Sequence, residues 1–189
     1  MASLKEHDAY ELVPVNLVPK GRKIISLRFV FKQNADGRFK ARLVVRGYSQ
    51  KAGIDYGKTF APVCCIGSER ILLAITCQQI WPVYQVDVQA AFLQRPIEGE
   101  VYVKMAPGQE ETDSKTGSPM VMKLKLSLYG LAQSPSLWNG SIDTALGIGF
   151  TPTASDPCVY TYGRDNLAIL TLCVDNILLN EANQKVVQR

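Results

Sequence analysis

Apolar and basic residues alternate along the segment ISLRFVFK, and the alternation returns in FKARLVV after the turn-forming stretch NADG. Side chains in a β-strand point alternately to its two faces, so this period of two, interrupted by turn residues, predicts a hairpin. The alternation places four basic side chains largely off the apolar face: Arg28, Lys32, Lys40 and Arg42. We therefore expect a β-ribbon with one basic side.

Several other segments predict strands and helices. VYQVDVQAAFL predicts a strand that enters a turn or a short helix, with Asp87 at its centre. EVYVKM and VMKLKLS predict paired strands, and LAILTLCVDNILLN predicts a strand pair that folds back at Val174–Asn176. SPSLWNGSIDTALGIGF predicts a helix, and ERILLAITCQQ predicts another that is capped by Ser68. Hairpins mixed with helices indicate an α+β fold, in which an antiparallel sheet is backed by helices.

Composition narrows the class of protein. Of the 189 residues 47% are hydrophobic and 20% are charged. No apolar run reaches the roughly 18 to 20 residues of a membrane span. Charges in the N-terminal segment MASLKEHDAYELVP argue against a signal peptide, so we expect an intracellular, cytoplasmic protein that is not secreted.

Cysteine and histidine usage narrows the chemistry. The five cysteines are odd in number and contain no CxxC pair, so we expect reduced and buried thiols. The single histidine, His7, argues against most zinc sites and against Ser–His–Asp or Cys–His catalysis. Carboxylates, lysines, arginines and oxygen-ligated metals remain as candidates for catalysis.

Positive charge is concentrated in one segment of the chain. Only Asp36 opposes the basic residues of this segment. They are Lys20, Arg22, Lys23, Arg28, Lys32, Arg38, Lys40, Arg42, Arg46 and Lys51. Such a bias predicts an anionic partner, first of all a nucleic acid or a nucleotide. The alternative is a solvated, lysine-rich edge that discourages aggregation.

Two aspartates, Asp87 and Asp175, lie inside strongly apolar strand patterns. A buried carboxylate is costly unless its charge is offset, and two neighbouring carboxylates repel each other. A divalent metal between them would resolve both problems, and Mg²⁺ prefers oxygen ligands. The pattern thus fits two-metal phosphoryl transfer. The alternative is that both aspartates are water-exposed turn or edge residues.

Seven longer motifs run in order from about residue 9 to residue 180. They are YELVPVN, FVFKQNADGRFKARLVVRGYSQKAGIDYGKTFAPV, VYQVDVQAAFL, EVYVKMAPG, LKLSLYGLAQSPSLWN, DPCVY and LTLCVDNILL. Together they resemble the reverse transcriptase of copia-type LTR retrotransposons. The resemblance implies a right-hand polymerase represented by fingers, roughly 9–80 and 100–140, and a partial palm, roughly 81–100 and 141–185.

The resemblance also implies roles for individual residues. Asp87 matches the first catalytic aspartate, Asp175 the second, and the backbone oxygen of Val88 is expected to add a metal ligand. Lys40 and Arg42 match contacts to phosphates of the template or the incoming nucleotide.

Phe92 matches the aromatic that stacks under the sugar and excludes a 2′-hydroxyl, although it also fits an ordinary core phenylalanine. Gln133 matches a glutamine near the incoming nucleotide and template, with a loop polar residue as the alternative.

The implied reaction is attack of a primer 3′-hydroxyl on the α-phosphate of a deoxynucleotide, with two Mg²⁺ ions, or Mn²⁺, as cofactors. The implied partners are an RNA or DNA template–primer and deoxynucleoside triphosphates, with no membrane.

The chain departs from the family pattern at the metal-binding turn. The family reads Tyr-Val-Asp-Asp where this chain reads Cys173-Val174-Asp175-Asn176. An amide offers a neutral oxygen but no negative charge, so we expect Asn176 to weaken or abolish activity. Family members usually carry a lysine where Ala132 stands, and often an arginine near Ser136.

The segments that would follow in the family are also expected to be missing: the thumb, ribonuclease H and the other polyprotein domains. The sequence therefore predicts a truncated reverse transcriptase domain. The alternatives are a non-catalytic nucleic-acid-binding remnant or a functionless product of a decayed element.

Overall fold

The computed structural model describes residues 2–163 and 168–181, and it divides into two compact units. The first unit contains Met1–Phe60 and Phe92–Trp138, and the second contains Ala61–Ala91 and Asn139–Arg189. The division places residues 61–80 in the second unit, whereas the predicted fingers extend to residue 80. Residues 182–185 of the predicted palm lie outside the described residues. The assignment of the two units to fingers and palm stays a prediction.

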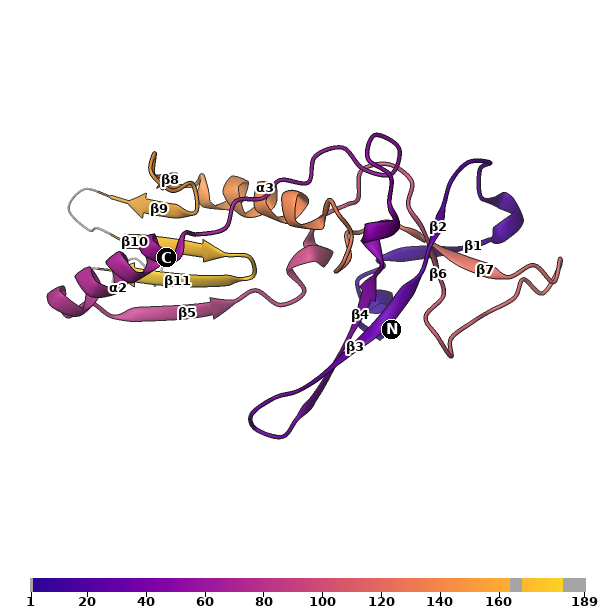
Figure 1. Ribbon diagram of the computed structural model, residues 1–189, viewed down its shortest axis with the longest axis horizontal. Helices are drawn as coiled ribbons and strands as arrows, with labels where there is room; N and C mark the ends of the chain where they lie inside the picture. Colours follow the sequence, from indigo (N-terminus) through magenta and orange to yellow (C-terminus); the bar gives the residue numbers. More distant parts are fainter. Residues whose placement is uncertain (1, 164–167, 182–189) are drawn as a thin grey trace. The chain divides into compact units, whose positions relative to one another are not determined.

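The first unit contains a four-stranded sheet with the order β1-β7-β6-β2 (Figure 1). Its strands are β1 (Tyr10–Pro14), β2 (Ile24–Ile25), β6 (Tyr102–Lys104) and β7 (Met120–Leu124). The predicted pairing of the segments around β6 and β7 is confirmed, since Val103 lies opposite Met122. Ile25, Val103 and Met122 are fully buried and form part of the core.

Short helical segments complete the first unit. They are the helix α1 (Ala2–Glu6) and the 3-10 turns η1 (Val15–Leu17) and η2 (Gly47–Ser49). A further 3-10 turn, η3 (Ala91–Gln94), begins at the last residue of the second unit's first segment and continues into the first unit.

The predicted basic hairpin is confirmed as a separate two-stranded ribbon of β3 (Leu27–Gln33) and β4 (Phe39–Val45). Lys32 lies opposite Lys40, and Val30 lies opposite Arg42. Residues directly opposite each other share a face, and faces alternate along a strand. The four cations Arg28, Lys32, Lys40 and Arg42 therefore share one face, and the three phenylalanines Phe29, Phe31 and Phe39 share the other.

The second unit is built on a five-stranded antiparallel sheet with the order β5-β11-β10-β9-β8. Its strands are β5 (Val83–Asp87), β8 (Phe150–Pro152), β9 (Val159–Tyr162), β10 (Ala168–Cys173) and β11 (Asn176–Glu181). Leu170 and Leu172 of β10 lie in its buried core with Tyr160 and with Leu72 of the helix α2 (Ile66–Gln79). The helix α3 (Ser134–Leu146) contributes Ile142 and Leu146 at the edge of this core.

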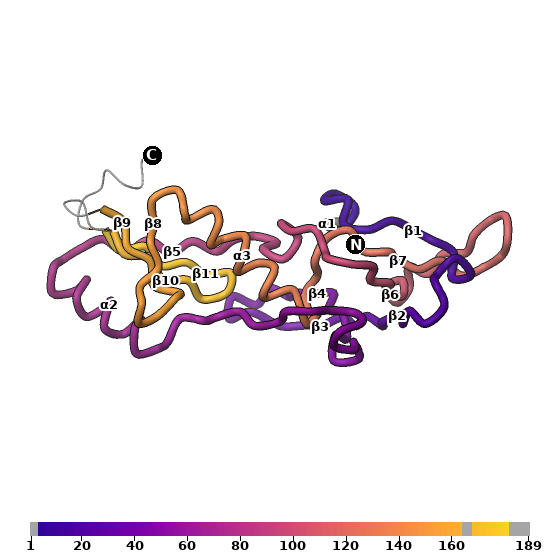
Figure 2. The backbone as a smooth tube through the Cα atoms, turned by 90° about the horizontal axis from the view of Figure 1, so that it is seen from above, coloured from indigo at the N-terminus to yellow at the C-terminus, as the bar shows by residue number. Residues whose placement is uncertain are grey.

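The predicted fold-back at Val174–Asn176 is confirmed, since β10 and β11 pair in register from Cys173 and Asn176 outward. The turn that joins them is the tight yellow loop in Figures 1 and 2.

The expected antiparallel sheet is present in the second unit, whereas the sheet of the first unit also contains one parallel pair, β2 with β6. One detail of the expected fold is wrong. Ser68 does not cap α2, because the helix already begins at Ile66 with Cys65 as its N-cap. The carboxylate of Asp156 accepts a hydrogen bond from the backbone N–H of Cys65 at 2.9 Å, so a residue distant in sequence satisfies this donor.

The mixture of helices and antiparallel hairpins agrees with the expected α+β class. Within the described residues, no helix has the length and apolar character needed to cross a membrane.

Candidate active site

Asp175 lies in a two-residue turn between the paired residues Cys173 and Asn176. Val174, the first residue of this turn, has a φ of 59°. Positive φ is sterically costly for a β-branched side chain, and glycine is the usual residue where such a turn needs it. Backbone strain of this kind concentrates at functional sites, where the surrounding structure holds it in place.

Strand β5 places Asp87 beside this turn. Asp87 lies directly opposite Asn176 in the antiparallel pairing of β5 with β11. The backbone N–H of Val88 donates to the carbonyl oxygen of Asp175 at 2.8 Å, which extends the pairing into the turn. The structure thus brings together all four residues predicted at the metal site: Asp87, Val88, Asp175 and Asn176.

The structure favours the alternative that the sequence left open for the two carboxylates, in which they are turn or edge residues and not buried ones. Asp87 is exposed and Asp175 is half-buried. Asp87 is the last residue of an edge strand, and Asp175 lies in a turn, so water reaches both despite their apolar neighbours in sequence. The desolvation argument for a metal is therefore wrong, and the case for a cation rests on the proximity of the two acidic residues.

Two side-chain hydrogen bonds link Asn176 to its neighbours. Its amide nitrogen donates to Oδ1 of Asp175 at 3.3 Å, and its amide oxygen accepts from Nε2 of Gln85 at 3.5 Å. A carboxylate at position 176 has no hydrogen to donate to Asp175 and would repel it instead. The amide of Asn176 therefore gives the Asp175 carboxylate one hydrogen bond, at the carboxylate that the sequence assigned to a cation.

The oxygen atoms at this site are suitable ligands for a hard divalent cation, although only two of the ligands are negatively charged. The carboxylates of Asp87 and Asp175 and the backbone oxygen of Val88 are oxygen donors of the kind that Mg²⁺ prefers. Within the ranges 2–163 and 168–181, no group of three or more His, Cys, Asp or Glu side chains is arranged to hold a metal. A third carboxylate is thus lacking at the place where the family pattern has one.

Lys40 and Arg42 lie on the basic face of the ribbon, where Lys40 is exposed and Arg42 is half-buried. Lys32 and Lys40 are directly opposite each other. Like charges in this position destabilise a strand pair, so a bound anion would relieve the repulsion. The ribbon belongs to the first unit and the carboxylates belong to the second.

Phe92 and Gln133 are buried in the first unit. The Phe92 ring is only 7% exposed and packs edge-on against Tyr129, with 4.5 Å between the ring centroids. Oε1 of Gln133 accepts from Nε2 of Gln50 at 3.0 Å, and its own Nε2 donates to the carbonyl oxygen of Asp55 at 3.4 Å. These contacts favour the core role that the sequence left open for Phe92 and a structural role for Gln133, and their nucleotide contacts stay predictions.

Sequence reasoning missed Gln85 and Gln50. The pattern of VYQVDV offered a signal for Gln85, because it lies two residues before Asp87 and so on the same face of the strand. No local signal identifies Gln50, whose partner Gln133 is 83 residues away.

The cysteine prediction is only partly right. All five cysteines are free, with Cys64 and Cys158 buried but Cys65, Cys77 and Cys173 exposed. Burial raises the pKa of the Cys64 thiol to about 12 and that of Cys158 to about 11, so neither is a ready nucleophile.

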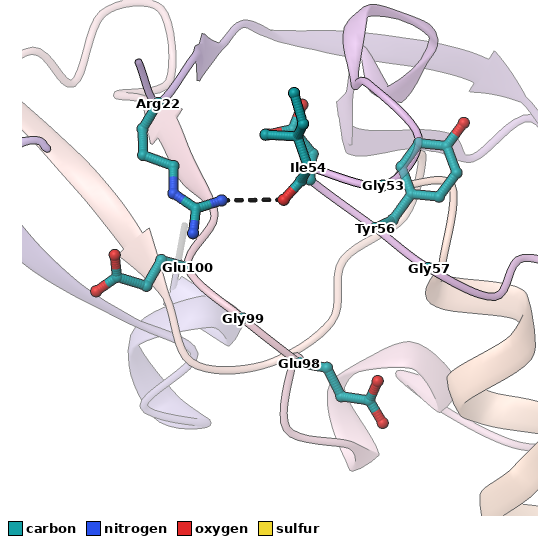
Figure 3. Close-up of a pocket in the computed structure, with 9 residues that line it drawn as sticks. Arg22, Gly53, Ile54, Tyr56, Gly57, Glu98, Gly99 and Glu100 are labelled. Atoms are coloured by element: carbon teal, nitrogen blue, oxygen red, sulfur yellow. Dashed lines mark hydrogen bonds between the residues drawn. The ribbon is translucent and has the colours of Figure 1, made fainter. Parts of the chain in front are cut away.

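One cavity of about 240 Å³ lies in the first unit and contains none of the predicted site residues (Figure 3). Arg22 crosses it and donates from Nη1 to the carbonyl oxygen of Ile54 at 3.0 Å. Asp55, Glu98, Glu100 and Tyr56 also line it. Three acidic side chains and one arginine make it unsuitable for a triphosphate, and we assign it no role in the candidate site.

A known family matches the chain over almost its whole length. The family model described as "Reverse transcriptase (RNA-dependent DNA polymerase)" matches residues 7–189. The chain is 39% identical over 187 residues to the retrovirus-related Pol polyprotein from transposon TNT 1-94 of Nicotiana tabacum. This match covers 95% of this chain and 14% of that polyprotein.

Other polyproteins of the same kind are also similar. The retrovirus-related Pol polyprotein from transposon RE1 of Arabidopsis thaliana is 37% identical, over 90% of this chain and 12% of the polyprotein. A transposon Ty1-ER2 Gag-Pol polyprotein of Saccharomyces cerevisiae is 26% identical, over 88% of this chain and 9% of the polyprotein. The chain thus spans a small part of the length of these relatives. It belongs to the reverse transcriptase family and is a reverse transcriptase domain of the copia-type retrotransposon Pol polyproteins.

Proposed function

We propose that Asp87 and Asp175 form the divalent-cation site of an RNA-directed DNA polymerase, and that Asn176 weakens this site. One observation carries the proposal: strand pairing places Asp87 opposite Asn176, next to the strained turn that holds Asp175. The expected substrates are a template–primer of RNA or DNA and deoxynucleoside triphosphates.

The proposed reaction is nucleotidyl transfer. The primer 3′-oxygen forms a bond to the α-phosphorus of the incoming nucleotide, the bond from that phosphorus to the bridging oxygen breaks, and pyrophosphate leaves while the hydroxyl proton passes to solvent. Bound Mg²⁺ or Mn²⁺ would supply a lowered hydroxyl pKa and neutralisation of the developing negative charge. The carboxylates of Asp87 and Asp175 and the backbone oxygen of Val88 are the ligands that this chain offers.

The ribbon supplies the positive charge that phosphates require. Lys40 and Arg42 share a face with Arg28 and Lys32. Lysine and arginine side chains on such a face contact backbone phosphates without reading sequence. We assign Lys40 and Arg42 to phosphates of the template or of the incoming nucleotide.

Asn176 is the residue expected to limit the rate. Its amide already donates to Asp175, and it adds no negative charge. Loss of one charged or polar group from a site that stabilises transition-state charge commonly costs about 100-fold to 1,000-fold in rate.

Primer extension on an RNA template tests the proposal, with Mg²⁺ and with Mn²⁺. We expect slow extension by the chain, extension about 100-fold faster or more by Asn176→Asp, and none by Asp87→Asn. Leu17→Ala, a change at an exposed residue of the first unit, serves as the control and should extend like the unchanged chain. Equal rates for the chain and Asp87→Asn would contradict the proposal.

The basic face supports a second candidate function, nucleic-acid binding without catalysis. The opposed pair Lys32 and Lys40 is the specific observation that favours it. If none of the variants extends a primer but the chain binds RNA with a steep dependence on salt concentration, this second function is the correct one.

A further inference from the structure

The loop that follows the basic ribbon carries an exposed tyrosine on a fixed backbone. Tyr48 lies in the 3-10 turn η2 and is 84% exposed. The backbone is held on both sides of it. Gly47 donates from its N–H to the carbonyl oxygen of Gly130 at 3.1 Å, and the carbonyl oxygen of Ser49 accepts from Nζ of Lys23 at 2.8 Å. A single exposed apolar side chain needs no explanation, but an aromatic ring on a fixed backbone is pre-organised for a ligand.

Side chains also hold the rest of this loop in place. Oε1 of the buried Gln50 accepts from the backbone N–H of Ala132 at 2.8 Å. Arg22 donates from Nη1 to the carbonyl oxygen of Ile54 at 3.0 Å. Arg22 and Lys23 belong to the basic segment from which the sequence predicted an anionic partner, but in the structure both hold this loop.

Two other cations of the basic segment, Arg46 and Lys51, flank Tyr48 along the chain. Both are exposed, and neither forms an ion pair within residues 2–163 and 168–181. Arg46 extends the pairing of the ribbon, because its backbone N–H donates to the carbonyl oxygen of Ser26 at 2.9 Å. It lies four positions after Arg42, so the alternation of faces assigns it to the basic face. The positive charge of the ribbon therefore continues to the loop that carries Tyr48.

We propose that Tyr48 stacks on an unpaired base of a single-stranded template, and that Arg46 and Lys51 bind the phosphates on either side of that base. Aromatic rings bind the bases of single strands by stacking, and cations beside them bind the backbone. Charged residues are depleted from the cores of protein–protein interfaces, so the two cations favour a nucleic acid over a protein. The proposal rests on the proposed function only through the assignment of the basic face to phosphates, and it requires neither catalysis nor a bound cation.

Fluorescence anisotropy with a labelled, unpaired RNA oligonucleotide tests the proposal. Tyr48→Ala should weaken binding about fivefold or more, whereas Tyr48→Phe keeps a ring and should bind like the unchanged chain. With an abasic oligonucleotide of the same length, Tyr48→Ala and the unchanged chain should bind equally, because no base is left to stack. Phe39→Ala serves as the matched control. Phe39 is also an exposed aromatic residue, at 82%, but it lies on the face of the ribbon opposite the cations, so this change should leave the affinity unchanged.

The dependence of binding on salt concentration separates stacking from the phosphate contacts. Tyr48→Ala should leave the slope of log K against log salt concentration unchanged, whereas Arg46→Ala should lower it by about 0.7. If the chain binds RNA but Tyr48→Ala binds it equally well, or loses as much affinity for the abasic oligonucleotide, the stacking proposal is overturned while the phosphate assignment of the basic face stands. If the chain binds no RNA at any salt concentration, both are overturned.

Discussion

At the residue scale, Asp156 joins the start of α2 to the loop before β9. Its carboxylate accepts from the backbone N–H groups of Cys65 at 2.9 Å and Cys158 at 3.0 Å. Burial acts to raise the pKa of Asp156, but these hydrogen bonds and one from Ser68 lower it, so that it lies below its ordinary value of 3.8. The ionised form is therefore favoured in the folded protein.

The first prediction concerns pH and Asp156. A carboxyl group whose pKa is lower in the folded state contributes stability above its unfolded pKa, and this contribution is lost as pH falls through the folded value. Asp156→Asn should lower the free energy of unfolding at pH 7 by about 1 to 3 kcal/mol. Below about pH 4 the unchanged chain should lose stability as Asp156 becomes protonated. The variant should lose less stability over the same pH range. Urea unfolding at pH 7 and at pH 3 measures both effects, and equal differences at the two pH values would contradict the assignment.

The second prediction concerns strain at Ile80. Because φ is 55° there, Ile80→Gly should raise the free energy of unfolding by about 1 kcal/mol. Thermal or urea unfolding measures the change. Ile148→Gly is the control, since Ile148 has the same exposure but is not among the non-glycine residues with positive φ. A destabilised Ile80→Gly variant would show that the isoleucine makes contacts that the strain argument neglects.

At the element scale, the base of the ribbon is held by a close backbone approach. Val45 donates from its backbone N–H to the carbonyl oxygen of Tyr129 at 2.8 Å, and Gly47 donates to that of Gly130 at 3.1 Å. Gly130 has a φ of 91°, and a Cβ there would lie 2.1 Å from the carbonyl oxygen of Val45. The glycines of the motifs RGYSQ and SLYGL therefore let two distant segments pair.

The third prediction follows from this approach. Gly130→Ala should destabilise the chain by more than about 2 kcal/mol, because the methyl group meets backbone rather than a movable side chain. Gly140→Ala is the matched control, since nothing lies within 4 Å of its added Cβ and helix α3 should gain about 1 kcal/mol. Urea unfolding of both variants measures the difference. A Gly130→Ala variant as stable as the unchanged chain would contradict the observed backbone approach.

The fourth prediction concerns the basic face of the ribbon. If Lys40 contacts a phosphate, Lys40→Ala should weaken RNA binding for all sequences and should lower the slope of log K against log salt concentration by about 0.7 to 1. Phe39→Ala, on the opposite face, should leave that slope unchanged. Fluorescence anisotropy at several salt concentrations measures it. The same slope for Lys40→Ala and the unchanged chain would remove Lys40 from the phosphate contacts.

Strand patterns made several elements predictable from the sequence. The period of two identified the ribbon, and the polar residues inside an apolar run identified the β10–β11 hairpin, because each is built from neighbouring segments. The parallel pairing of Ile24 with Tyr102 was not predictable, since it depends on residues 78 positions apart. The helix α2 was predicted, but its exposed apolar surface was not, because an apolar sequence is expected to be buried.

At the scale of the whole molecule, the candidate site was only partly predictable. The family motif placed Asp87, Val88, Asp175 and Asn176 together, and the strand register does the same. The sequence left open whether Asp87 is buried or exposed, because apolar neighbours in sequence do not show whether a strand lies at an edge. The burial of Phe92 and Gln133 arises from long-range packing that no local pattern encodes.

The central claim is that Asp87 and Asp175 hold a divalent cation and that Asn176 weakens its binding. Titration of Mn²⁺ followed by electron paramagnetic resonance tests it on the intact chain without requiring catalysis. We expect weak binding by the unchanged chain, binding at least tenfold tighter by Asn176→Asp, and loss of that gain when Asp87→Asn is added. Equal Mn²⁺ affinity for the chain and Asn176→Asp would contradict the account.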